Sequence, residues 1–416
     1  MLRSGGAVIL MECDKIENKI EKLAGGWTFQ EGKARQPFDQ NVLEFLEELS
    51  KEISQNKKTA VSMEARAFAF WCRKNHISQW KMESKKDECT LGLGMIFHIA
   101  PSNIPLLFAY SMVWGMLSGN GNVIRISQRT LEESKDLCEV IDQVMKREKY
   151  QEIYKNNLIM TYEREDEITK ELSLFCDGRV VWGGDATIEH MREYPLKPTA
   201  AELTFPDRNS IAVFDLAYMK QISKKEREDL AYRFYNDTFL MDQNACSSPR
   251  LIYWLDQEKI SEDESQKIKE EWWKIFSKVS RNYDLTPWKS SKKYEQICSE
   301  IMEFHEIDKV TKYGENLIYV SQIRNEPKQV SHYQGKFGCF YEYEIKSFKE
   351  LCKVLDRKVQ TIVYEGINPK ELVEELIRNG VKGADRIVRA GSALQLDRIW
   401  DGKDVIGSLS RVIQIK

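Results

Sequence analysis

Short apolar runs alternate with longer amphipathic stretches through the first half of the chain. Four of these runs have the length of a buried strand, at residues 92–99, 122–126, 158–161 and 179–182. Helical patterns separate them, and the helix predicted over 104–118 ends at the turn-forming run 119–122. The alternation of strand and helix predicts an α/β fold with a parallel, doubly wound sheet. The usual dinucleotide fingerprint GxGxxG is absent from the sequence.

Two further regions flank this pattern. Residues 40–85 carry a helical stripe of apolar positions and then an aromatic-rich segment, which predicts helices packed against the main body. After about residue 240, strands return beyond a charged helical stretch at 257–308, and they predict a second α/β domain. A chain of 416 residues is also too long for one ordinary core.

Composition excludes several classes of function. Lys and Arg number 62 against 65 Asp and Glu, and a net charge of −3 argues against a nucleic-acid binder. The longest apolar stretch, 104–117, is too short to span a membrane. Residues 1–10 imitate a signal peptide only weakly, because acidic residues follow at once. Nine cysteines without CxxC pairs predict a cytoplasmic protein with reduced thiols, and five histidines without ligand spacing predict no metal site.

One cysteine has unusual surroundings. Cys246 lies in the run Asp242–Arg250 among small and polar residues, whereas an inert core thiol usually lies among aliphatic ones. About 140 positions upstream, the run His98–Pro105 closes a strand and opens a helix. A candidate nucleophile together with a candidate oxyanion-binding turn indicates covalent acyl chemistry.

These runs resemble the acyl-CoA reductase family, which includes the LuxC-type fatty-acid reductases and is a branch of the aldehyde dehydrogenase superfamily. The resemblance covers roughly residues 40–416, and its motifs keep their order. The segments that carry it are 98–105, 118–125, 182–185, 242–249 and 385–388.

The resemblance implies an aldehyde-dehydrogenase-like pair of α/β domains. We expect an N-terminal helical region packed on the cofactor domain, a nicotinamide-cofactor-binding domain, a catalytic thiol domain, and a C-terminal return and oligomerisation segment. Their predicted bounds are 1–90, 91–238, 239–395 and 396–416.

The same resemblance assigns the catalytic residues. Cys246 is the expected nucleophile, with its pKa lowered by a nearby helix N-terminus or by an oxidised nicotinamide. The Asn103 amide is expected to donate to the oxyanion together with the backbone N–H of Cys246. The alternative for Asn103 is a helix N-cap, although Ser102 can cap the helix instead.

Cofactor residues follow the ends of other predicted strands. Arg125 stands where aldehyde dehydrogenases carry a Lys, and with Ser127 and Arg129 it is expected to grip a ribose 2′-phosphate, which favours NADPH over NADH. Its alternative is a surface arginine. Gly183 and Gly184 would let a helix N-terminus approach the pyrophosphate, or they form only a tight turn. Ser102 and Phe337 complete the predicted cofactor set.

Three other positions resemble or depart from superfamily motifs. Phe337 and Gly338 look like a remnant of the turn that binds the nicotinamide ribose, but a Gly-Lys pair replaces its glutamate-containing start. Glu202 lacks the glycines that follow the hydrolytic base of aldehyde dehydrogenases, and a reductase gains from excluding water, so we expect a structural or substrate-orienting role. His98 is expected to buttress the turn that carries Asn103.

We interpret the chain as an acylating oxidoreductase that uses NADPH to reduce an acyl thioester, fatty acyl-CoA above all, to the aldehyde through an acyl-cysteine. One alternative is a reductase subunit that takes its acyl group from a partner acyl-protein synthetase. Another is a non-catalytic nucleotide-binding subunit of the same fold. A homo-oligomer is expected. Acyl length and pathway are left open.

Overall fold

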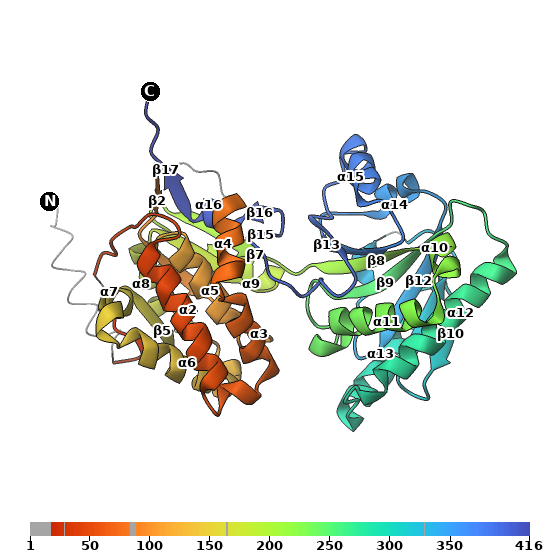
Figure 1. Cartoon of the computed structure of the whole chain (residues 1–416), viewed down its shortest axis with the longest axis horizontal. Helices are drawn as coiled ribbons and strands as arrows, with labels where there is room; N and C mark the ends of the chain where they lie inside the picture. The colour runs from red at the N-terminus through yellow and green to blue at the C-terminus, as the bar shows by residue number, and fades with distance from the viewer. Residues whose placement is uncertain (1–17, 29, 84–88, 164, 328) are drawn as a thin grey trace. The chain divides into compact units, whose positions relative to one another are not determined.

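The computed structural model describes residues 18–28, 30–83, 89–163, 165–327 and 329–416, so the signal-like start at 1–10 lies outside it. The chain forms two compact units, the first made of Met1–Pro206 with Lys403–Lys416 and the second of Asp207–Gly402 (Figure 1). The division falls at 206/207 rather than at 238/239. The reason is that strand β8 (Asn209–Asp215) pairs with β9 and β13 of the second unit.

The first unit is built on a six-stranded sheet with the order β1-β5-β4-β3-β6-β7. All neighbours are parallel except β1 and β5. The strands are β1 (Glu21–Gly25), β3 (Met95–Ile99), β4 (Gly121–Arg125), β5 (Asn157–Thr161), β6 (Gly178–Trp182) and β7 (Ala201–Phe205). Strand β1 was not predicted, whereas the four central strands were.

Helices cover both faces of this sheet. Phe97 and Ile99 of β3 belong to a core cluster completed by residues of α8 (Asp166–Phe175) and α9 (Asp185–Arg192). His98, which alternates with them along β3, contacts α5 (Leu107–Leu117) on the opposite face. Strands whose successive residues are all buried are typical of a parallel sheet between two helical layers.

The remaining elements of the first unit surround this sandwich. Helix α2 packs against α3 and α6, and short strands β2 and β17 pair with each other in antiparallel fashion. Their bounds are α2 (Gln40–Gln55), α3 (Met63–Trp71), α4 (Lys74–Glu83), α6 (Leu131–Met145), α7 (Gln151–Lys155), α16 (Val405–Ser408), β2 (Thr90–Gly92), β16 (Lys403–Asp404) and β17 (Ser410–Val412).

The second unit contains a seven-stranded sheet with the order β10-β11-β12-β9-β8-β13-β14. Only the β10–β11 pair is antiparallel. The strands besides β8 are β9 (Pro249–Leu255), β10 (Ile307–Tyr313), β11 (Ile318–Ile323), β12 (Cys339–Ile345), β13 (Val359–Glu365) and β14 (Arg386–Arg389). The short β15 (Ile399–Trp400) follows.

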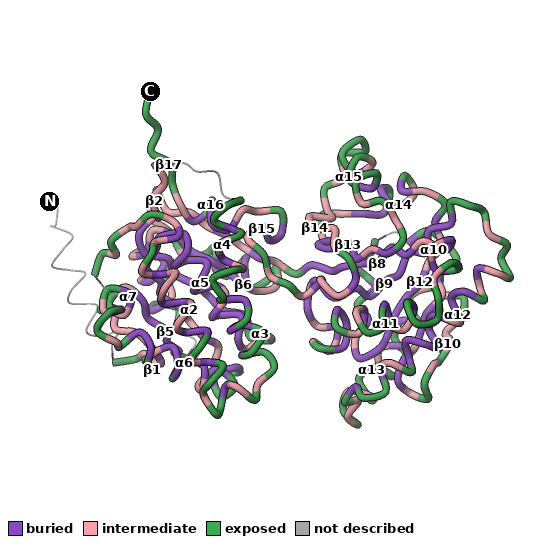
Figure 2. The backbone as a smooth tube through the Cα atoms, in the orientation of Figure 1, coloured by how far each residue is buried: buried purple, intermediate pink, exposed green. Residues whose placement is uncertain are grey.

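Alternate residues of β8 and β9 enter two different core clusters. Ala212 and Phe214 pack with α11 and α12, whereas Ile211 and Val213 pack with α14 and α15. Figure 2 shows the buried strands between more exposed helices. The helices are α10 (Leu216–Gln221), α11 (Lys224–Thr238), α12 (Glu262–Val279), α13 (Pro287–Glu303), α14 (Phe348–Val354) and α15 (Pro369–Arg378). The predicted α/β class is thereby confirmed.

Candidate active site

Most of the predicted residues of the first unit follow the carboxyl ends of adjacent parallel strands. Asn103 follows β3, Arg125 ends β4, and Gly183 follows β6. Because β3 lies between β4 and β6, the fold brings these three segments to one edge of the sheet. The carboxyl edge of a doubly wound sheet is where such folds bind nucleotides.

The turn that carries Ser102 and Asn103 does not cap the helix after it. Helix α5 begins at Leu107 rather than at 104, and its N-cap, Leu106, makes no side-chain capping bond. Both Ser102 and Asn103 are exposed. The alternative of a helix N-cap is therefore wrong for both residues, and the Asn103 amide makes no hydrogen bond to any other described residue.

A buried hydrogen-bond chain runs beneath this turn. Trp182 Nε1 donates to Ser111 Oγ over 2.9 Å, and Ser111 Oγ lies 2.7 Å from His98 Nδ1. His98 Nε2 lies 3.0 Å from Asn122 Oδ1, whose amide then donates to Asn157 over 2.8 Å. Because Ser111 has a single proton to donate, the chain is satisfied when His98 is neutral and protonated on Nε2.

Burial supports the neutral form of His98. The residue is fully buried, and desolvation lowers its pKa to about 4. A side chain at Gly115 would meet Asn122 Oδ1 at 1.8 Å, so α5 can approach the chain only with glycine there. The network ties α5 to the end of β6, which directly precedes Gly183. His98 thus contributes to the site as part of its framework.

Arg125 is held by an aromatic residue that the sequence did not reveal. Its guanidinium carbon lies 4.8 Å from the centre of the Tyr162 ring, and Tyr162 follows β5, the strand next to β4. The Tyr162 hydroxyl lies 2.9 Å from Thr169 Oγ1. Arg125 Nε is buried without a hydrogen-bond partner among the described residues. Only pairing of β4 with β5 makes these two residues neighbours.

The other predicted cofactor residues follow strands β4 and β6. Ser127 Oγ accepts the backbone N–H of the exposed Arg129 over 3.3 Å at the start of a short 3₁₀ helix. Gly184 is the N-cap of α9 without a side-chain bond, and a Cβ at Gly183 would lie 2.9 Å from Thr187 Cβ. The close approach explains why glycine is needed at Gly183.

Glu202 is engaged in ion pairs. It lies on β7, where Arg179 Nη2 approaches its carboxylate to 2.5 Å and Arg192 Nε to 3.2 Å. These partners hold its pKa below the ordinary value despite the desolvation that opposes them. A carboxylate with two arginine partners is a poor general base.

The predicted residues of the second unit lie at the opposite kind of sheet edge. Cys246 precedes β9, and Phe337 precedes β12, so both lie at the amino ends of adjacent parallel strands. The loop of Cys246 follows α11 and a 3₁₀ helix, Phe239–Met241. The chain thus enters this loop from the C-terminal end of a helix.

Cys246 is fixed against the start of β8. Ser210 Oγ donates to the Cys246 carbonyl over 2.7 Å and accepts the Thr361 N–H over 3.1 Å. The backbone amide of Arg208 favours the thiolate form of Cys246. Burial raises the pKa of the Cys246 thiol, and the Arg208 N–H and the Arg250 charge counteract that rise only in part.

The Phe337 turn is bonded to the Cys246 loop. Gly338 N–H donates to Gln243 Oε1 over 2.7 Å, and Gln243 Nε2 donates to the Cys339 carbonyl over 3.1 Å. The Phe337 N–H donates to the Asp242 carbonyl over 3.3 Å. A Cβ at Gly338, whose φ is +94°, would meet Leu317 O at 2.2 Å. The turn predicted from Phe337 and Gly338 thus lies directly beside the predicted nucleophile loop.

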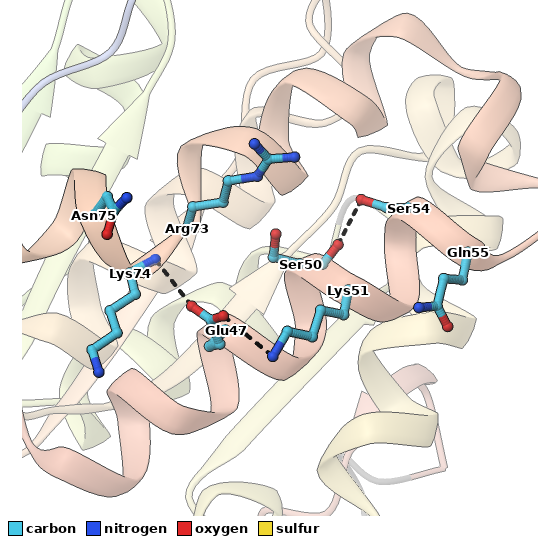
Figure 3. A pocket seen from close by; sticks show the side chains of 8 residues that line it. All are labelled: Glu47, Ser50, Lys51, Ser54, Gln55, Arg73, Lys74 and Asn75. Carbon is cyan, nitrogen blue, oxygen red and sulfur yellow. Dashed lines mark hydrogen bonds and ion pairs between the residues drawn. The ribbon is translucent and has the colours of Figure 1, made fainter.

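A hollow of about 430 Å³ lies elsewhere, between α2 and the start of α4 (Figure 3). Its polar lining is largely paired within itself, since Glu47 accepts from Lys51 Nζ and from the Lys74 backbone N–H. None of the predicted site residues lines it. Among the described residues, no group of His, Cys, Asp and Glu could hold a metal ion, and no helix is long and apolar enough to cross a membrane.

Solved structures define the class of this fold as that of the aldehyde dehydrogenases. A 1-pyrroline-5-carboxylate dehydrogenase matches with a TM-score of 0.63 at 12% identity, over 89% of this chain and 80% of that one. A salicylaldehyde dehydrogenase from Pseudomonas putida G7 matches with a TM-score of 0.59 at 13% identity, over 91% and 85%. The chain spans only 43% of a matched proline utilization A protein from Bdellovibrio bacteriovorus, whose TM-score is 0.61 at 12% identity over 90% of this chain.

The chain belongs to the acyl-CoA reductase (LuxC) family, whose model matches residues 38–412. The resemblance seen in the sequence is thus confirmed. A search of curated proteins found no match.

Proposed function

We propose that the protein reduces an acyl thioester, fatty acyl-CoA above all, to the aldehyde with NADPH through an acyl intermediate on Cys246. One observation carries the proposal: the Cys246 loop is bonded to the turn of Phe337 and Gly338 and to the start of β8. Such bonding holds a nucleophile in one place, as covalent catalysis requires.

The chain's residues account for the covalent steps. The Cys246 thiolate forms a bond to the acyl carbon, the donor's C–S bond breaks, and the donor leaves as a thiolate. The Asn103 amide donates to the oxyanion that develops in this step and in the reduction. When bound, NADPH supplies a hydride. The acyl-Cys246 carbonyl becomes a hemithioacetal, whose collapse releases the aldehyde and restores the thiolate.

The carboxyl edge of the first sheet fits a dinucleotide. Because Gly183 has no Cβ to meet Thr187, α9 can begin close to the end of β6, where its backbone N–H groups suit a pyrophosphate. Arg125, with its unpartnered Nε, suits a 2′-phosphate, and Ser127 and Arg129 add donors. Ser102 lies on the exposed turn of the same edge. A matched succinic semialdehyde dehydrogenase from Streptococcus pyogenes was solved with NADP⁺, and a Sinorhizobium meliloti aldehyde dehydrogenase is described as NAD-dependent.

Phe337 is proposed to contact the nicotinamide ribose. It is mostly buried, and its φ of +55° holds it in a turn beside the thiol loop. Eight described cysteines are free, which supports a reducing, cytoplasmic setting. A homo-oligomer and an acyl-protein synthetase partner remain predictions.

The test is covalent trapping. The protein is mixed with a panel of acyl-CoA lengths without reduced cofactor, and intact mass with peptide mapping locates the acyl group. We expect an adduct on Cys246, lost in Cys246→Ala and retained in Cys138→Ala and Cys352→Ala. An adduct on another cysteine, or none while NADPH-dependent turnover proceeds, would overturn the assignment.

Turnover then separates the alternatives. Release of one CoA per NADPH oxidised supports acyl-CoA as the donor. Reduction that needs an added acyl-protein synthetase supports the partner-delivered route. A protein that binds NADPH but neither acylates nor turns over is the non-catalytic subunit.

A further inference from the structure

Arg250 makes more contacts with the Cys246 loop than a surface arginine would. It is the second residue of β9 and only 4% exposed. Its Nε and Nη2 donate to the Gln243 carbonyl over 3.2 and 2.8 Å, and Nη2 also reaches the Ala245 carbonyl at 3.4 Å. These bonds close the loop on itself, because Arg250 lies just after it. The guanidinium thus sets the path of the chain into Cys246.

The shape of the loop depends on such a clamp. Asp242 and Gln243 have φ values of +53° and +59°, a left-handed conformation that costs free energy for residues with a Cβ. The Asp242 carboxylate is anchored by Tyr283 Oη at 2.6 Å and Lys289 Nζ at 2.9 Å. Arg250 anchors the part of the loop that follows. The backbone is therefore held from both ends.

One nitrogen of the guanidinium takes no part in these loop hydrogen bonds. Arg250 Nη1 is buried without a hydrogen-bond partner among the described residues. A buried charged donor left unpaired is costly. Arg250 and Cys246 also act on each other electrostatically, so the charge reaches the thiol.

The other charges near the thiol do not replace Arg250. Asp207, before β8, and Asp401, after β15, both disfavour a thiolate. The Arg208 backbone N–H favours it as a dipole only. Lys336, before β12, is half-buried and repelled by Arg250. Among these groups, Arg250 is the side-chain cation whose charge favours the Cys246 thiolate.

We propose that Arg250 is a positioning residue that clamps the Cys246 loop and supplies the positive charge that favours the Cys246 thiolate. The inference rests on the proposed role of Cys246 as nucleophile. In the step concerned, the thiol loses its proton to solvent and the sulfur keeps the electron pair. Arg250 itself remains protonated throughout.

The experiment measures the alkylation of Cys246 by iodoacetamide, in which an S–C bond forms and iodide leaves. Neither acyl donor nor cofactor is needed. Rates are followed from pH 6 to 10.5 by peptide mapping in wild type, Arg250→Gln and Arg250→Lys. The exposed Cys298 serves as an internal control in every sample. Glutamine keeps a hydrogen-bond donor without charge, whereas lysine keeps the charge with fewer donors.

We expect the Gln variant to alkylate Cys246 about tenfold more slowly at neutral pH, because a nearby cation typically shifts a pKa by one unit or more. Its pH midpoint should rise by a similar amount, while the Lys variant stays within about threefold of wild type. Equal losses in both variants, or an unmoved Gln midpoint, would overturn the charge role.

The experiment distinguishes a variant that fails to fold from a failure of the proposed function. If Arg250→Gln does not fold, Arg250→Met replaces it as the uncharged variant: a raised midpoint in Arg250→Met with an unmoved one in Arg250→Lys would support the proposal, and an unmoved midpoint in Arg250→Met would contradict it. If covalent trapping places the acyl group elsewhere than Cys246, the proposed function fails. In that case the alkylation profile still reports whether Arg250 controls this thiol.

Discussion

The two units use opposite edges of similar sheets. In the first unit, the predicted residues follow the carboxyl ends of β3, β4 and β6, where helices such as α9 begin. In the second, Cys246 and Phe337 precede the amino ends of β9 and β12. Helix N-termini carry partial positive charge, which suits an anionic dinucleotide. Helix C-termini carry partial negative charge.

This difference explains why the two edges differ in the charged side chains that they need. Backbone dipoles at the first edge already favour phosphates, so few charged side chains are needed there. At the second edge, burial disfavours the Cys246 thiolate. The proposed role of Arg250 is to counteract this effect with a side-chain cation. Variants at and beneath the two edges test this difference.

The largest effect is expected at the first edge, where the proposed role of Asn103 is in the chemical step and not in cofactor binding. Asn103→Ala should lower kcat by about two to three orders of magnitude, the usual cost of losing one oxyanion donor. Steady-state kinetics and NADPH titration measure it. The dissociation constant of NADPH should barely change. Loss of NADPH binding with kcat preserved would make Asn103 part of the cofactor site instead.

The next effect tests the buried chain beneath that edge. The pKa of His98 falls from 6.5 to about 4 on folding, so the unfolded chain binds the proton more tightly. Stability from neutral His98 is complete above pH 6.5 and is lost as the pH falls to 4, by about 3 kcal/mol. Urea unfolding at pH 7 and pH 4 should show this loss.

His98→Gln should reduce that pH dependence, because glutamine does not titrate. His305→Gln, at an exposed histidine, is the matched control and should behave as wild type. A wild-type protein equally stable at pH 7 and pH 4 would contradict a neutral, buried His98.

A smaller effect is expected where the Phe337 turn meets the Cys246 loop. Gln243→Ala leaves the Gly338 N–H and the Cys339 carbonyl without their partner, which should cost about 2 kcal/mol of unfolding free energy. Thermal melting and activity together measure it. Asn244→Ala, at the half-buried neighbour, is the matched control. If both variants melt alike, the two segments are not coupled through Gln243.

The smallest effect concerns cofactor choice. Arg125→Leu should weaken NADPH binding about tenfold, with NADH little affected, because a bidentate arginine matches a 2′-phosphate. The loss should appear in KM more than in kcat, since the contact is remote from hydride transfer. Fluorescence titration with both cofactors tests it, and Arg125→Lys should fall between. An unchanged ratio of the two dissociation constants would assign Arg125 to another ligand.

Much of the fold could be predicted from local patterns. The buried strands β3, β4, β5 and β6 were found because parallel strands between helical layers are uninterrupted apolar runs. Strand β1 was not predicted, because Glu21–Gly25 is an edge strand that carries charged residues. Its pairing with β5 cannot be recognised from its amino-acid composition. The boundary at 206/207 also depends on pairing, because β8 joins strands far away in the chain.

The class of fold and the residues with chemical capacity can be recognised in the sequence alone: a thiol among small polar residues, an Asn in a Pro-containing turn, and an Arg at a strand end. The surroundings of these residues depend on the folded chain. Folding brings the Tyr162 ring to Arg125, and it brings Arg208 and Arg250 near Cys246. The reason is physical: side-chain capacity is local, whereas burial, charge and partners come from strands that only folding brings together.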